Sequence, residues 1–215
     1  MKVKVIGCQI FQYLAEQIGM LDYDVNFLSI AQHDQPALLK QTLQNEINAS
    51  QDYDLILLLY GLCGNAVAGL KSERVPLRVF RIHDCSSLFL NDANQVINQR
   101  WSCYELWKNH MDWGNNEQEW LERYGEHAQY LREILCGNNE IAYLTFHRKE
   151  DEEAKQGLIQ EGKKIIKEYE GNKEALEAML RQQKHPLILS LQPQEEIVAM
   201  IDHSILKVKS SIQRK

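Results

Sequence analysis

The chain has 215 residues, a formal net charge of −6, 44% hydrophobic residues and 25% charged residues. These proportions are typical of a globular protein, and the acidic balance gives no reason to expect nucleic acid or an anionic membrane as a partner. No apolar run approaches the ~20 residues that span a bilayer, and a strand begins without a signal-peptide segment, so we expect a cytoplasmic protein.

The first ninety residues alternate between predicted strands and helices. The strands are expected at residues 2–6, 24–30, 54–60 and 76–82, all of them apolar runs bounded by glycine or a polar break. Helical spacing of apolar residues follows the first strand, and Pro36 opens a second helix. The alternation predicts a Rossmann-like, open, mostly parallel sheet with the first strand in its centre.

The remaining chain is expected to complete a single α/β domain over residues 1–215. Residues 91–137 hold all four tryptophans and predict a helical, aromatic-rich insertion with helices at 94–109 and 117–135. Residues 138–215 predict the remaining sheet and helices: a strand at 140–146, a charged helical stretch from 150 to about 183, and two strands at 186–191 and 196–201. We expect those two strands to pair as a C-terminal β-hairpin, followed by a frayed basic tail from Lys207.

Each of three predicted strands ends on a short motif that contains a cysteine. The motifs are Gly7-Cys8, Gly61-Leu62-Cys63-Gly64-Asn65 and His83-Asp84-Cys85. The carboxyl ends of parallel strands meet at one edge of a sheet, where ligands bind. Cys8, Cys63 and Cys85 are therefore expected to converge there together with His83, and the second strand delivers His33 to the same edge.

A cluster of this kind predicts a metal centre. Thiolates are soft ligands that suit zinc, iron or an iron–sulfur cluster, and three protein ligands would leave one position open for a substrate. In this hypothesis Cys8, Cys63 and Cys85 bind the metal, and His83, His33 or an exogenous ligand completes the site. The simpler interpretation is that the cysteines are buried packing residues and that Asp84 caps a helix.

A second hypothesis makes Cys63 a nucleophile, with His83 as its base and Asp84 or Asp34 as the residue that orients the base. Gly61 and Gly64 would let the backbone approach a bound group, and a helix starting at Asn65 would favour the thiolate. This hypothesis gives Cys8 and Cys85 no role. Dinucleotide binding is disfavoured, since the chain has no GxGxxG motif after its first strand.

The spaced motifs resemble the family catalogued as domain of unknown function 1638. The residues that carry the resemblance are Gly7-Cys8, Gln32-His33-Asp34-Gln35-Pro36, Tyr60-Gly61-Leu62-Cys63-Gly64-Asn65 and His83-Asp84-Cys85. The resemblance implies that the Cys, Cys and His-Asp-Cys set is the functional core. It also suggests a link to corrinoid-dependent methyl transfer in anaerobes, with a small-molecule substrate, a corrinoid or a methyltransferase protein as partner. Family members often carry a Pro-Gly-Trp segment, for which the nearest match here is Asp112-Trp113-Gly114.

Three functional classes follow from these patterns. The first is an enzyme or accessory factor of anaerobic one-carbon metabolism, with a thiolate-rich metal site that activates a small substrate. The second is a non-catalytic protein that carries electrons or delivers metal. The third, a purely structural zinc domain, ranks last because structural sites are usually closed by four ligands on short hairpins.

Overall fold

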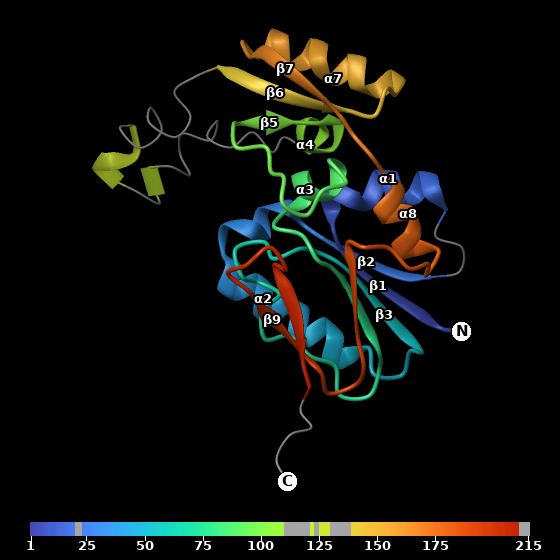
Figure 1. The fold of residues 1–215 in the computed structure, drawn as a ribbon. Coiled ribbons are helices and arrows are strands. Elements are labelled where there is room, and N and C mark those ends of the chain that lie inside the picture. The colour runs from blue at the N-terminus through green and yellow to red at the C-terminus, as the bar shows by residue number, and fades with distance from the viewer. Residues whose placement is uncertain (20–22, 110–120, 123–124, 130–138, 211–215) are drawn as a thin grey trace. The chain divides into compact units, whose positions relative to one another are not determined.

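The computed structural model describes residues 1–19, 23–109, 121–122, 125–129 and 139–210. The chain divides into two compact units (Figure 1). Unit 1 comprises Met1–Val96 and Asn172–Lys215, and unit 2 comprises Ile97–Gly171. The Asp112-Trp113-Gly114 segment and most of the predicted helix at 117–135 lie outside the described residues.

Unit 1 is built on a five-stranded sheet in the order β2-β1-β3-β4-β8. The first four strands are mutually parallel, and β8 pairs antiparallel with β4. This arrangement confirms the mostly parallel sheet and the central position of the first strand. The strands are β1 (Val3–Cys8), β2 (Asp24–Leu28), β3 (Leu55–Leu59), β4 (Leu77–Phe80) and β8 (Ile188–Leu191).

Helices cover both faces of this sheet (Figure 1). Leu58 pairs with Val79, so Tyr60 shares a face with Val79 while Phe80 points to the opposite face. The Phe80 ring lies 6.1 Å from the Phe11 ring just before α1, and the Tyr60 ring lies 5.9 Å from the His33 ring just before α2. The helices of unit 1 are α1 (Gln12–Ile18), α2 (Pro36–Ala49), α3 (Cys85–Phe89) and α8 (Glu174–Leu180), with 3-10 turns η1 (Gln9–Phe11) and η2 (Ile30–Asp34).

The expected C-terminal hairpin is present, but its strands differ from the predicted pair. It consists of β9 (Glu196–Ala199) and β10 (Leu206–Lys209), while the apolar run at 186–191 becomes β8 and joins the main sheet. The start of the segment that was expected to fray is therefore a strand. Ile197 and Leu206 are both buried, which gives the hairpin an apolar face.

The helix predicted from Asn65 is wrong, because the chain there forms a series of turns. Cys63, Gly64 and Asn65 have φ angles of 45°, 66° and 71°, and Gly69 has a φ of 85°. Residues in this left-handed region cannot begin a right-handed helix. The loop after β3 thus offers no helix N-terminus to Cys63.

Unit 2 has a sheet of its own, in the order β5-β6-β7 and with parallel pairing throughout. The strand expected at 140–146 is β6 and does not extend the main sheet. Most of the helix predicted at 94–109 is absent, and within the charged stretch expected to be helical, residues 164–170 form β7 after Gly162, whose φ is 82°. The elements are β5 (Trp101–Ser102), α4 (Tyr104–Lys108), η3 (Gly125–His127), β6 (Glu140–Thr145), α7 (Lys149–Gln160) and β7 (Lys164–Glu170).

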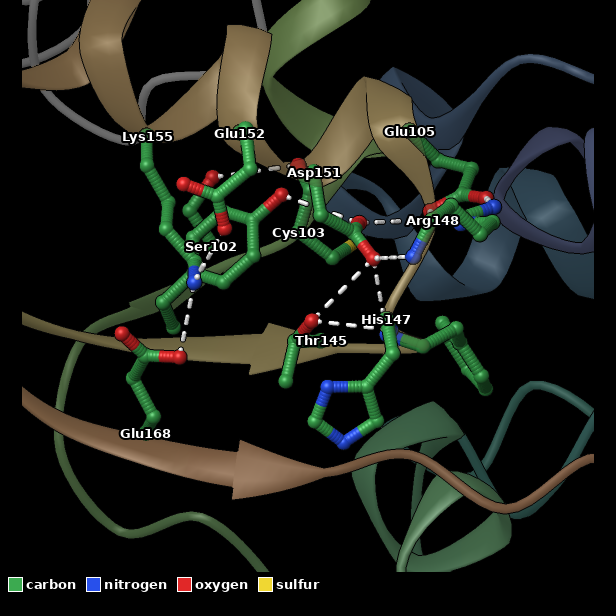
Figure 2. A network of polar contacts seen from close by, with 12 residues as sticks. Ser102, Cys103, Glu105, Thr145, His147, Arg148, Asp151, Glu152, Lys155 and Glu168 are labelled. Carbon is green, nitrogen blue, oxygen red and sulfur yellow. Dashed lines mark hydrogen bonds and ion pairs between the residues drawn. The ribbon is translucent and has the colours of Figure 1, made fainter.

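A buried polar network holds α7 against β6 (Figure 2). The Asp151 carboxylate accepts hydrogen bonds from Tyr143 Oη, Thr145 Oγ1 and the backbone amide of Phe146, at 3.2, 3.1 and 2.9 Å. Arg148 reaches Asp151 Oδ1 from the same turn of the chain, at 3.1 Å. The carboxylate oxygens of Asp151 accept these hydrogen bonds, and the guanidinium of Arg148 neutralises their charge. Asp151 can therefore remain ionised although it is fully buried.

Among the described residues, no helix has both the length and the apolar character needed to cross a membrane.

Candidate functional site

The strand register places Cys8 beside Tyr60 at the carboxyl edge of the main sheet. Cys8 is the last residue of β1, and Gly7 pairs with Leu59, the last residue of β3. The next pair along these parallel strands is Cys8 and Tyr60. Paired residues of neighbouring strands point to the same face, so both side chains lie on the face that carries His33 and α2.

The loop that carries Cys63 is fixed by backbone hydrogen bonds to the segment after β4. Leu62 N donates to the carbonyl of Ile82 at 2.9 Å, and Cys63 N donates to the carbonyl of His83 at 3.0 Å. A Cβ atom at Gly61 would lie only 2.5 Å from Ile82 Cγ1 and 2.9 Å from its carbonyl oxygen, so this close approach requires glycine. On the other side, a Cβ atom at Gly64 would lie 3.3 Å from Pro36 Cγ at the start of α2.

The thiols of Cys8 and Cys63 interact and are held in the neutral form. Cys8 is buried and Cys63 is half-buried, and both are reduced. Burial raises the pKa of each thiol to about 12, and the charge of Cys63 contributes to the rise at Cys8. The expectation that the loop would make Cys63 easier to ionise is therefore wrong, because burial dominates and no helix begins there.

Tyr60 is a residue of this site that the sequence alone did not identify. Its side chain is 0% exposed, and its hydroxyl has no hydrogen-bond partner among the residues that the structure describes. Burial raises the pKa of Tyr60, and the charges of Cys8 and Cys63 raise it further, which places the phenol near both thiols. Burying a hydroxyl without a hydrogen-bond partner destabilises the folded protein by about 1–3 kcal/mol. Tyr60 is therefore an unusual residue at the end of an otherwise apolar strand.

His33 covers the ring of Tyr60, with an angle of 22° between the two ring planes. Its Nδ1 lies 3.0 Å from the carbonyl oxygen of Ile30. A carbonyl can only accept, so Nδ1 carries the proton and the neutral ring has its lone pair on Nε2. This is the tautomer in which Nε2 can act as a metal ligand.

The His83-Asp84-Cys85 motif lies at the same edge and builds the start of α3. His83 is exposed and supplies the carbonyl that accepts from Cys63 N. Asp84 is the N-cap of α3 and accepts from Ser87 N at 3.2 Å and from Ser86 Oγ at 2.6 Å. Cys85 is the first residue of α3 and is half-buried. Asp84 therefore caps α3, as the simpler interpretation of the sequence predicted.

The structure therefore brings Cys8, Cys63 and Tyr60 together, with His33 packed against Tyr60; we call these four residues the edge cluster. Within the described ranges, no three His, Cys, Asp or Glu side chains are arranged to hold a metal ion. The metal-ligand roles of Cys85, His83 and His33, and the ligand-contacting roles of Gly61, Gly64 and Asn65, stay predictions.

Comparison with known proteins identifies a family to which the chain is similar. A family model described as protein of unknown function (DUF1638) matches residues 27–180. No curated protein and no solved structure matches the chain. The matched region includes Cys63, His83 and Cys85 and begins after Cys8. The description of the family names no reaction, so the link to corrinoid-dependent methyl transfer stays a prediction.

Proposed function

The chain belongs to the DUF1638 family, and we propose that it binds a thiophilic metal ion, zinc or iron, at the carboxyl edge of its main sheet. Cys8 and Cys63 would be the first two ligands. Two observations support this proposal: β1 pairs in parallel with β3, so that Cys8 and the loop that carries Cys63 lie at the same edge, and, besides burial, the charge of Cys63 raises the pKa of the Cys8 thiol. Ligands bind at this position in open parallel sheets.

The chemistry of the two thiols fits such an ion. A divalent metal replaces the two thiol protons, so binding releases protons and the two thiolates cancel the metal's charge. Zinc and iron accept thiolate together with imidazole. His33 stacks on Tyr60 on the same face, and His83 and Cys85 follow β4 at the same edge. These three side chains are the candidates for a further protein ligand.

A metal held by two or three protein ligands keeps a position for an exogenous ligand. Such an ion can polarise a bound oxygen or sulfur, which is the chemistry of an enzyme or accessory factor that activates a small substrate. The high pKa of the Cys63 thiol gives less support to the alternative in which Cys63 is a free nucleophile.

Anaerobic purification followed by elemental analysis and a visible spectrum tests this proposal. We expect about one zinc or iron ion per chain in the wild-type protein, and its loss in Cys8→Ala and Cys63→Ala variants whose far-UV circular dichroism is unchanged. Cys103→Ala is the matched control, since Cys103 is also reduced and buried but belongs to unit 2. Metal that stays bound in both Cys8→Ala and Cys63→Ala would overturn the proposal.

A further inference from the structure

We draw no further inference here: the strongest candidate, the outer edge of β2 in the main sheet, has no neighbouring strand among the described residues, but nothing in the structure shows what covers it.

Discussion

The guanidinium of Arg148 lies between two buried carboxylates, with 2.7 Å from Nη1 to Glu105 Oε1 and 3.1 Å from Nη2 to Asp151 Oδ1 (Figure 2). The side chain of Arg148 is only 9% exposed, and those of Glu105 and Asp151 are 2% and 1% exposed. Glu105 belongs to α4, while Arg148 and Asp151 belong to the start of α7. This triad therefore links the two helices through charges that water does not screen.

Arg148→Met should strongly destabilise unit 2, because it leaves two buried carboxylates without their cation. We expect the free energy of unfolding to fall by about 3–5 kcal/mol in urea denaturation. Lys164→Met is the control, since it removes a cation from an exposed ion pair with Glu140 and should change that free energy by less than about 1 kcal/mol. Equal effects of the two substitutions would contradict this interpretation of the triad.

The stability of unit 2 should fall in acid through Asp151. Burial alone would raise the pKa of this carboxyl, but the hydrogen bonds and charge of Arg148 and the backbone donors outweigh it and lower the pKa below 3.8. The unfolded state therefore binds the proton more readily, so the stabilisation is complete above pH 3.8 and is lost as the pH falls below that value. Melting temperatures measured from pH 6 to pH 2 should decline less steeply in Asp151→Asn. Glu153→Gln, an exposed change on the same helix, should keep the wild-type slope.

Two tyrosine-to-phenylalanine substitutions should affect the free energy of unfolding of the metal-free protein differently. Tyr60→Phe removes a buried hydroxyl without a described partner, so the free energy of unfolding should stay unchanged or rise by up to about 1 kcal/mol. Tyr143→Phe removes a donor to Asp151 and should lower it by about 0.5–1.5 kcal/mol. Chemical denaturation measures both values. A loss at Tyr60 as large as that at Tyr143 would mean that the Tyr60 hydroxyl has a partner inside the protein.

Cys8 and Cys63 should react slowly with alkylating agents in the folded, metal-free protein. A pKa of about 12 in place of 9.0 lowers the thiolate fraction at pH 8 by roughly a thousandfold. Iodoacetamide labelling followed by peptide mass spectrometry should therefore modify both residues much faster in urea than in buffer. Rapid labelling of Cys63 in the native protein would instead favour the nucleophile hypothesis.

The main sheet could be predicted from the sequence because its strands are short apolar runs that end abruptly. β3 is buried at every position, and its run of Leu and Ile is too short for a typical buried helix, which leaves a buried strand as the interpretation. The strand order predicted that Cys8 and the loop that carries Cys63 lie at the same edge of the sheet. β7 was not predicted, because its Glu and Lys residues also fit an exposed helix. Only its pairing with β6 makes this segment a strand.

The details of the edge cluster depend on tertiary structure and could not be predicted. The left-handed backbone at Cys63 accompanies a hydrogen bond from its amide to the carbonyl of His83, and the local propensity of cysteine gives no sign of it. Tyr60 looks like an ordinary last residue of a strand until its burial and its lack of a described partner are known. The same holds for Glu105 and Arg148, which are far apart in the sequence and look like surface charges.

The discontinuity of unit 1 has a consequence for synthesis on the ribosome. β4 ends at Phe80, but β8, which pairs with its outer edge, begins only at Ile188. Throughout translation of unit 2 the nascent chain carries an unpaired, apolar strand edge, the kind of surface on which chains aggregate. Truncation before β8 should therefore yield insoluble protein, even though the edge cluster lies entirely within the first ninety residues.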